Sequence, residues 1–547
     1  MQLRIKFSVI SILPLFSKAL GLPGHEQRSA DDAPIVDLGY AQYQGVFDIS
    51  TNTTSFLGVR YAASPVGELR WQNPQAPETV SGVQQADTQP STCFMAGSGT
   101  SPTNPFPPNK RQVSAPPQSE DCLFLNVFFP GSTIPASNDT LLPTVVWIHG
   151  GGYIAGSASQ FTGSDLIRES NDGVVAVIIQ YRLGIFGFLA GNEVNENGVL
   201  NAGLLDQNFA LRWVNQHISK FGGDPTRVTI WGESAGAGSV LQQVIAEDGQ
   251  TTPQLFRAAM TSSTFLPSQY AFNDTIPQTI FDQVVEQTNC TSSSDTLGCL
   301  RQVDASLLQD ANFRINQEGF FGTFVTVPVV DGTFIKQRVT EALTQGKVNG
   351  DVILAVTNAD EGSNFVNQSA PLNASFYASQ LFPNLGPNEI SMVEQAYSDL
   401  GSDITQDNLI MSEAIFVCPS YFLLNAFQNR SFKGEFALPP ATHGLDVSYY
   451  FPTSVSSSFG RSYVSNERNL SGKTLSFNST AFISSFAGSF LSFVVSLDPN
   501  DKVDALNDIT PNWPLFSGEE MKFNKTQDNN TDIGLVMTDS GVLERCR

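Results

Sequence analysis

The stretch that most constrains the fold is Arg227-Val-Thr-Ile-Trp-Gly-Glu-Ser-Ala-Gly-Ala-Gly238. A β-branched run ends at Trp231, and a helix-forming run, Ala237 to Ala246, follows Gly236. Ser234 would therefore occupy a sharp turn between a strand and a helix, where the backbone is strained. The glycines two residues to either side remove the side chains that would clash there. Ser234 is the chain's only match to this Gly-x-Ser-x-Gly pattern, and we predict that it is a nucleophile.

Outside this turn, short apolar runs bounded by turn residues alternate with helix-like stretches. The runs have the length and composition of buried strands: Leu123 to Phe129, Thr144 to Ile148, Val174 to Gln180, Val228 to Trp231 and Val352 to Val356. The stretch from Leu205 to Lys220 has apolar residues at helical spacing. This alternation predicts a large, mostly parallel α/β sheet with helices on both faces. Because no linker-like segment divides the chain, we expect a single large domain.

A serine nucleophile needs a base, and imidazole is the usual one. Of the four histidines, His25 lies near the N-terminus, His149 precedes a run of glycines that it would support, and His217 suits the surface or end of a helix. His443 lies in a loop-like segment 209 residues after Ser234. In folds with this strand-turn-helix element the histidine comes last in the chain. By elimination, His443 is predicted to be the base.

The carboxylate that orients the imidazole should lie between the serine and the histidine. Many acidic residues satisfy that order. Asp360 and Glu361 follow the strand-like segment Asp351-Val-Ile-Leu-Ala-Val-Thr-Asn-Ala359, at the carboxyl end where α/β sheets collect functional groups. Spacing alone does not separate these two candidates.

Donors for an oxyanion are predicted in Thr144-Val-Val-Trp-Ile-His-Gly-Gly-Gly-Tyr153, a strand that ends in three glycines. Glycines let backbone N–H groups approach a substrate carbonyl, and one such donor typically contributes about 3 kcal/mol to catalysis. Gly151 and Gly152 would form the hole together with the amide of Ala235. A nucleotide-binding loop is disfavoured, because the glycine spacing differs and no Lys-Ser/Thr pair follows.

The composition limits the partners. The chain has 547 residues, 41% of them hydrophobic, and can bury a large core. Acidic residues outnumber basic ones by 52 to 29, which gives a formal net charge of −23. This charge is opposite to the one that nucleic acids attract, so we predict no nucleic-acid partner.

The N-terminus has the features of a signal peptide. Arg4 and Lys6 precede an apolar run from Phe7 to Phe16, and Ser17-Lys-Ala19 offers small residues to a signal peptidase. We predict a signal peptide over residues 1–19, a mature domain over residues 20–547, and secretion. Ala481 to Leu497 is apolar but contains five serines, and is interpreted as a partly buried helix. No membrane anchor is therefore predicted.

Two further features agree with secretion. The six cysteines would pair in an oxidising compartment, although the sequence leaves the pairing open: Cys93, Cys122, Cys290, Cys299, Cys418 and Cys546. Eleven Asn-x-Ser/Thr sequons are candidate sites for N-glycans: Asn52, Asn138, Asn273, Asn289, Asn367, Asn373, Asn429, Asn469, Asn478, Asn524 and Asn529.

Along nearly its whole length the chain resembles the type-B carboxylesterase/lipase family, the cholinesterase-like α/β-hydrolases, and in particular its secreted fungal-type members. Besides the serine turn, the motifs that carry the resemblance are Phe56-Leu-Gly-Val-Arg-Tyr-Ala, Pro65-Val-Gly-Glu-Leu-Arg-Trp71, Ser119-Glu-Asp-Cys-Leu-Phe-Leu-Asn-Val127, Tyr181-Arg-Leu-Gly-Ile-Phe-Gly187, Asn201-Ala-Gly-Leu-Leu-Asp-Gln207 and Phe221-Gly-Gly-Asp-Pro225. The resemblance implies an α/β-hydrolase fold and ester hydrolysis through an acyl-enzyme, without a metal or an organic cofactor.

The resemblance also implies residue roles. Glu361 rather than Asp360 would complete the triad with Ser234 and His443, and the oxyanion donors would be Gly151, Gly152 and Ala235. The implied disulfides are Cys93–Cys122, Cys290–Cys299 and Cys418–Cys546, with an ion pair between Arg70 and Glu120. Ser262 would lie near the acid.

The substrate is less constrained by the sequence. The proline-rich segment from Phe94 to Asp121 cannot form one long amphipathic helix of the kind that covers related lipases. This favours a general carboxylesterase over a lipase or sterol esterase. A non-catalytic, cholinesterase-like binding protein is the alternative of another class, disfavoured because Ser234, Glu361 and His443 are all present.

Overall fold

The computed structural model describes residues 33–103, 118–134, 140–453, 475 and 477–547. The predicted signal peptide, His25 and the sequons at Asn138 and Asn469 lie outside these residues, as does much of the proline-rich segment. The described residues form a single α/β domain.

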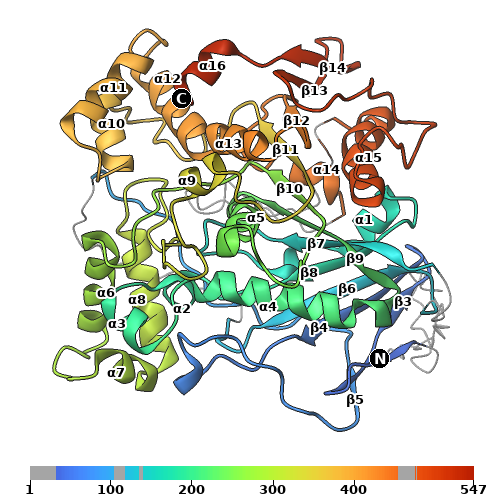
Figure 1. Cartoon of the computed structure of the whole chain (residues 1–547), viewed down its shortest axis with the longest axis horizontal. Coiled ribbons are helices and arrows are strands. Elements are labelled where there is room, and N and C mark those ends of the chain that lie inside the picture. Colours follow the sequence, from blue (N-terminus) through green and yellow to red (C-terminus); the bar gives the residue numbers. More distant parts are fainter. Residues whose placement is uncertain (1–32, 104–117, 135–139, 454–474, 476) are drawn as a thin grey trace, which may run out of the picture.

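An eleven-stranded sheet runs through the domain (Figure 1). Its strands, in spatial order, are β14 (Thr531–Met537), β13 (Glu519–Lys525), β12 (Ser431–Phe436), β11 (Val352–Asn358), β10 (Ala258–Ser262), β9 (Gly223–Glu233), β7 (Leu142–Ile148), β8 (Val175–Ile179), β6 (Phe124–Pro130), β4 (Thr53–Arg60) and β3 (Val46–Asp48). All neighbours from β13 to β8 are parallel, whereas β14 at one end and β6, β4 and β3 at the other are antiparallel. The predicted mostly parallel sheet is confirmed. A second, three-stranded sheet contains β1 (Ile35–Asp37), β2 (Gln42–Gln44) and β5 (Val83–Gln85).

The central strands are buried on both faces, which explains their continuous apolar sequences. Successive side chains of a strand point to opposite faces. In β7, Val146 and Ile148 join the core on one face, while Val145 and Trp147 join the core on the other. Each of the five predicted runs overlaps a strand, and the predicted helix from Leu205 corresponds to α4 (Ala202–His217) followed by a short 3₁₀ turn.

Helices cover both faces of the sheet. On one face lie α4, α5 (Ala235–Ile245), α9 (Val339–Thr344) and α13 (Cys418–Ala426), and on the other α1 (Gly163–Glu169), α14 (Val447–Tyr450) and α15 (Thr480–Ser496). Two further groups lie at the left of Figure 1. The lower group comprises α2 (Gly184–Phe188), α3 (Asn192–Asn197), α6 (Thr275–Gln287), α7 (Thr296–Gln302) and α8 (Ala305–Gln317), and the upper comprises α10 (Ala374–Leu381), α11 (Pro387–Tyr397) and α12 (Asp403–Ser412).

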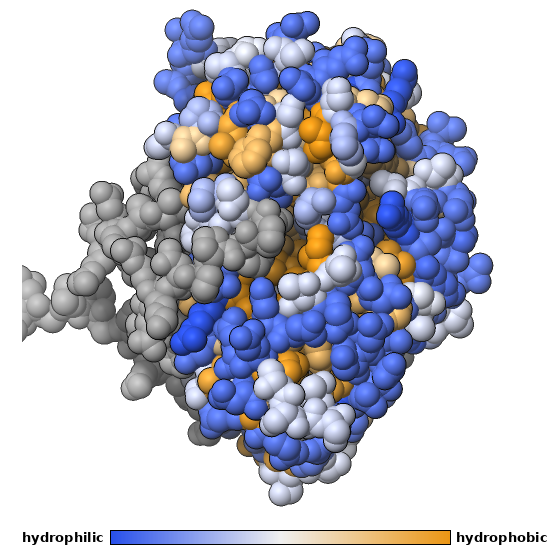
Figure 2. Space-filling model, turned by 90° about the vertical axis from the view of Figure 1, so that its left-hand side faces the viewer, coloured by the Kyte–Doolittle hydropathy of each residue, from blue (hydrophilic) through white to orange (hydrophobic). Residues whose placement is uncertain are grey.

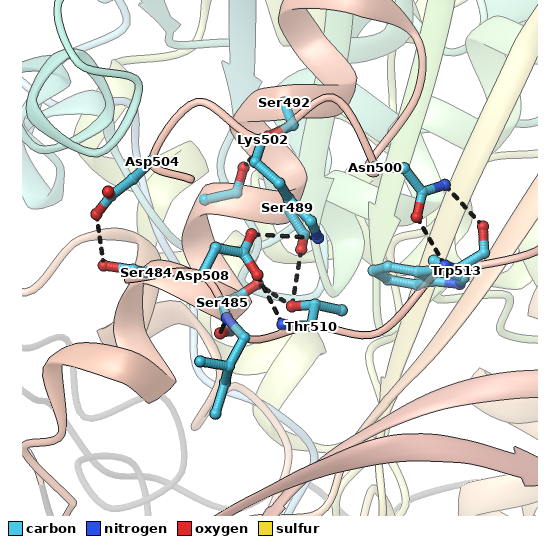
Figure 3. Close-up of polar contacts among 12 residues, drawn as sticks. Ser484, Ser485, Ser489, Ser492, Asn500, Lys502, Asp504, Asp508, Thr510 and Trp513 are labelled. Carbon is cyan, nitrogen blue, oxygen red and sulfur yellow. Dashed lines mark hydrogen bonds and ion pairs between the residues drawn. The ribbon is translucent and has the colours of Figure 1, made fainter. Parts of the chain in front are cut away.

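Helix α15 corresponds to the predicted serine-containing apolar helix, and its serines bind the following loop (Figure 3). The Ser485 hydroxyl accepts a hydrogen bond from the backbone N–H of Ile509 at 2.8 Å, and Ser492 accepts one from Val503 at 3.1 Å. These serines are fully buried. The central part of α15 is buried and its ends are not, so the predicted partly buried helix is confirmed.

Among the described residues, one helical stretch, Asp403–Ala426, is long and apolar enough to cross a membrane. It consists of α12, a π-helical turn (Glu413–Val417) and α13, and 67% of its most apolar window is buried inside the fold. Burial of this kind is typical of a core helix.

Three disulfides are present: Cys93–Cys122, Cys290–Cys299 and Cys418–Cys546. The third joins the start of α13 to the end of α16 (Ser540–Arg545), next to a bidentate ion pair between Arg545 and Glu413. The ion pair between Arg70 and Glu120 also forms, with contacts of 2.6 and 2.7 Å. The three disulfides and the Arg70–Glu120 ion pair are the pairs that the resemblance implied.

Candidate active site

Ser234 lies at the junction of β9 and α5, where the sequence places the sharp turn. Its backbone angles are φ 55° and ψ −124°, a region that residues with side chains rarely adopt. A Cβ atom on Gly236 would lie 2.0 Å from the carbonyl oxygen of Ile148, and one on Gly232 would lie 2.4 Å from the backbone of Gly236. Both glycines are therefore required for the strand and the helix to approach so closely. The backbone N–H of Ser234 donates to the carbonyl of Ser262 on β10 at 3.0 Å.

His443 and Glu361 are in direct contact after β11 and β12. The distance from Nδ1 of His443 to Oε2 of Glu361 is 2.6 Å, and the other carboxylate oxygen of Glu361 accepts the backbone N–H of Asn358 at 2.7 Å. Both side chains are buried. The Asp360 carboxylate instead accepts hydrogen bonds from the backbone and hydroxyl of Ser363. Of the two acids left open by spacing, Glu361 is thus the one that contacts the imidazole.

The other imidazole nitrogen, Nε2, lies on the side of the nucleophile turn. It is 3.3 Å from a carboxylate oxygen of Glu233, the residue before Ser234. Within the described residues Nε2 makes no hydrogen bond, so the contact between His443 and the Ser234 hydroxyl is not formed in this structure. Such bonds are often long before substrate binds.

Glu233 and His443 influence each other's protonation. Burial raises the pKa of Glu233 from its ordinary value of 4.5 to about 8. Burial opposes protonation of His443, but the Glu361 carboxylate, which is bonded to Nδ1, outweighs it and raises the pKa of the imidazole. At neutral pH the buried Glu233 carboxyl therefore holds a proton.

This shift predicts how stability depends on pH. Between pH 4.5 and about 8, folded Glu233 keeps a proton that the unfolded chain has lost, so the free energy of unfolding falls as pH rises. We expect Glu233→Gln to lose less stability than the unaltered protein between about pH 5.5 and pH 7.5, by about 2 kcal/mol. Urea unfolding at the two pH values measures this difference. Glu394→Gln, on the exposed side of α11, is the control and should retain the original pH dependence. If the free energy of unfolding changed equally with pH in all three proteins, the pKa of Glu233 would not be raised in the folded state.

The glycine run forms a tight loop beside Ser234. Gly151 and Gly152 have φ values of 107° and 64°, which favour glycine. A Cβ atom on Gly150 would lie 3.0 Å from the Cβ of Ser234, so this loop directly faces the serine. Within the described residues the N–H groups of Gly151 and Gly152 donate no hydrogen bond and are free to bind a ligand oxygen. The amide of Ala235, the first residue of α5, also lacks the partner that a helix interior would supply.

The observed positions of two other histidines, His149 and His217, can be compared with the positions predicted from the sequence. His149 supports the glycine loop, as predicted: its Nδ1 pairs with the carbonyl of Gly150 at 2.9 Å and its ring stacks on Tyr181. Of the two positions predicted for His217, the end of a helix is confirmed, because His217 is the last residue of α4, whereas the surface position is wrong. Its ring is buried against Tyr40 and Trp213, and burial lowers its pKa to about 4.

A buried polar network behind Glu361 was not predicted from the sequence. Asp446, three residues after His443, accepts hydrogen bonds from the Asn358 amide at 3.0 Å and from Tyr450 at 3.2 Å. Ser262 donates a hydrogen bond to the hydroxyl of Tyr450, so it is linked to Glu361 only through this network. Burial raises the pKa of Asp446 to about 6. The network fixes Asn358, whose backbone N–H donates to Glu361. The only feature of the sequence that points to this network is a carboxylate, Asp446, close to His443.

An apolar cavity of about 300 Å³ adjoins the histidine. Phe365 and Phe416 line it, and their rings pack on His443 with centroid distances of 4.9 and 4.4 Å. Phe416 lies on the π-helical turn, a feature frequent at functional sites. Phe324 lines the cavity and touches Gly152. Figure 2 shows the side of the molecule that carries α6 and α10, where apolar side chains gather in a hollow between polar surfaces.

The described residues contain no group of three or more His, Cys, Asp or Glu side chains that could hold a metal ion. The arrangement offers a hydroxyl on a strained turn, a carboxylate-bound imidazole and free backbone amides. These are the components of acyl transfer.

The mostly parallel sheet and the strand–serine–helix turn define an α/β-hydrolase. The model of the Carboxylesterase family matches residues 32–540, so the chain belongs to this family and is a carboxylic ester hydrolase.

Known relatives agree with this assignment. The chain is 31% identical to "Lipase 4" of Diutina rugosa, covering 86% of this chain and 87% of the relative, and 29% identical to "Carboxylesterase patB" of Penicillium expansum, covering 90% and 91%. It is 32% identical to "Secreted lipase 1" of Botryotinia fuckeliana, covering 71% of each. Among solved structures it is similar to Aspergillus niger EstA, with a TM-score of 0.80, 30% identity, and coverage of 95% of this chain and 98% of that one.

Proposed function

We propose that the protein is a secreted serine esterase that works through an acyl-enzyme on Ser234. The observation that carries the proposal is the 2.6 Å contact between His443 and Glu361, next to a serine held at a strained strand–helix junction. A carboxylate on Nδ1 fixes the imidazole with its Nε2 available to accept a proton.

The proposed reaction has two halves. His443 takes the hydroxyl proton of Ser234 as the oxygen attacks the ester carbonyl, and the resulting oxyanion is bound by the amides of Gly151, Gly152 and Ala235. His443 then gives the proton to the leaving alcohol. Water attacks the acyl-enzyme in the second half, again with His443 as the base, and releases the acid.

The cavity supports an ester with a sizeable apolar part. Its volume is at the lower end of the range for small-molecule sites, and Phe365 and Phe416 connect it to His443. We propose a general carboxylesterase for soluble esters of this kind, since the proline-rich segment cannot form a long amphipathic lid. The second candidate is a lipase or sterol esterase, favoured by the apolar hollow on the surface (Figure 2).

Secretion is supported by three disulfides and by the distribution of sequons. With Asn138 and Asn469 outside the described residues, nine sequons remain, and their asparagines are exposed except for the half-buried Asn524. We propose that the protein carries N-glycans at exposed sequons. Glycosidase treatment of the protein secreted by a eukaryotic host should lower its mass.

A fluorophosphonate probe tests the proposed mechanism, because it reacts covalently with an activated serine. We expect one adduct per chain, and peptide mass spectrometry should place it on Ser234. Labelling elsewhere, or none in a folded sample, would contradict the proposal.

Hydrolysis rates for a series of acyl chain lengths, measured below and above the solubility limit of the ester, separate the two substrate candidates. A higher rate on emulsions indicates a lipase.

A further inference from the structure

A glycosylation sequon lies beside the mouth of the apolar cavity. Among the described residues that line the cavity, only Thr275 and Thr279 are exposed, and both lie in the first half of α6. The cavity therefore meets the solvent along this part of the helix. Thr275 is also the third residue of the sequon Asn273-Asp-Thr275, whose asparagine is exposed just before the helix begins.

The attachment point for a glycan is held in place next to this mouth. The carboxylate of Asp274 accepts a hydrogen bond from the backbone N–H of Ile276 at 3.1 Å and another from the side-chain amide of Asn384 at 3.1 Å. Ile276 lines the cavity, and so does Pro383, which precedes Asn384. Asp274 thus ties the start of α6 to the segment that follows α10, and its neighbour Asn273 has a fixed place beside both.

The side chain of Asn273 is available for modification. Within the described residues it makes no hydrogen bond, whereas the side-chain amide of Asn52, in another sequon, donates to Asp172 at 3.1 Å. A glycan is bulky and hydrophilic, so it stays in the solvent. Because Cα atoms two residues apart are separated by at most about 7 Å, the first sugar on Asn273 would lie close to Thr275 and to the mouth.

A glycan at this position acts differently on dissolved and on aggregated esters. No Asp, Glu, Lys, Arg or His is among the described residues that line the cavity, and Figure 2 shows apolar side chains gathered in the hollow. An apolar hollow of this kind adheres to the surface of a lipid droplet that reaches it. A hydrophilic chain beside the mouth keeps the droplet at a distance, whereas a single dissolved ester is small enough to pass.

We propose that Asn273 carries an N-glycan that restricts the enzyme to dissolved esters by keeping lipid surfaces away from the mouth of its cavity. The inference rests on the proposed esterase function and on the proposed glycosylation. It goes beyond both by assigning one sequon a role in the choice of substrate.

Tributyrin tests the proposal, because the same ester can be supplied in solution or as an emulsion. The protein is secreted from a eukaryotic host, and peptide mass spectrometry should find a glycan on Asn273. The quantity measured is the ratio of the hydrolysis rate on the emulsion to the rate just below the solubility limit. We expect Asn273→Gln to raise this ratio by about 3- to 10-fold and to keep the rate on dissolved tributyrin within about 2-fold.

Matched variants show whether the glycan at the mouth is responsible. Asn289→Gln removes the sequon beyond the other end of α6, a helix about 20 Å long, and should leave the ratio unchanged. At position 275, Thr275→Val removes the sequon and should raise the ratio, whereas Thr275→Ser preserves the sequon and should not.

Glycosidase treatment of the folded, unaltered protein provides a test that needs no variant. The treatment should raise the ratio to the value of Asn273→Gln, and the same treatment of Asn273→Gln should change the ratio little. Circular dichroism checks that the treated and the variant proteins remain folded.

The outcomes separate this inference from the proposed function. If dissolved tributyrin is hydrolysed but Asn273 carries no glycan, or if removal of the glycan leaves the ratio unchanged, the inference fails and the esterase proposal stands. The inference also fails if Asn289→Gln raises the ratio as much as Asn273→Gln, because the glycans would then act through overall solubility. If the folded protein hydrolyses no ester, the esterase proposal fails and this inference fails with it.

Discussion

Ser234→Ala is expected to lower kcat for a chromogenic ester by about 10⁴- to 10⁶-fold, to the level left by the amides and the binding site alone. The hydroxyl of Ser234 is the atom that would form the acyl bond, and alanine removes it while keeping the Cβ atom. Because the backbone conformation and the glycines around the turn are unchanged, the fold should persist. Steady-state kinetics with para-nitrophenyl esters, with circular dichroism of the same sample, measure both effects.

Ser234→Gly is the matched variant that separates chemistry from strain. At φ 55° and ψ −124° a side chain is unfavourable, and glycine relieves that cost. We expect this variant to be as inactive as the alanine variant and more stable than the unaltered protein by about 1–2 kcal/mol in urea unfolding. Substantial ester hydrolysis by both folded variants would show that another residue is the nucleophile.

The nucleophile turn could be predicted from sequence because its determinants are local. Gly232 and Gly236 flank Ser234 in the chain, and the structure shows that neither position has room for a Cβ atom. The glycine loop is local in the same way, and its position next to Ser234 follows from the parallel pairing of β7 with β9. Buried central strands were predictable because both of their faces are apolar.

The long-range contacts could not be predicted in this way. The contact of His443 with Glu233, and the hydrogen bond between Asn358 and Asp446, join segments separated by many residues. Nothing in local spacing reveals them. The sequence predicts the helix end at His217, but its burial depends on aromatic rings that come partly from the distant N-terminal segment. The strands and the nucleophile turn can therefore be predicted from local sequence. The charged and polar groups around His443 cannot.

Glu361→Gln is expected to lower kcat by about 10⁴-fold with a much smaller change in KM. The amide retains an oxygen that can accept the N–H of Asn358, so the loop after β11 should keep its position. Its NH₂ group would then face Nδ1 of His443 and favour the tautomer that carries its proton on Nε2, which cannot accept the proton of Ser234. Loss of the negative charge also removes the strongest influence that raises the pKa of His443, so the acidic limb of the residual pH–rate profile should move to lower pH.

Asp360→Asn is the control that the chain itself provides. Asp360 is the neighbouring acid that spacing could not distinguish from Glu361, but its carboxylate bonds to Ser363, whereas the imidazole bonds to Glu361. Asparagine keeps an acceptor for those bonds, so kcat should stay within a few-fold of the unaltered enzyme and the pH–rate profile should not move. If the two variants lost activity equally, general disturbance of this loop would explain the result. If only Asp360→Asn were inactive, Glu361 would not be the acid that orients His443.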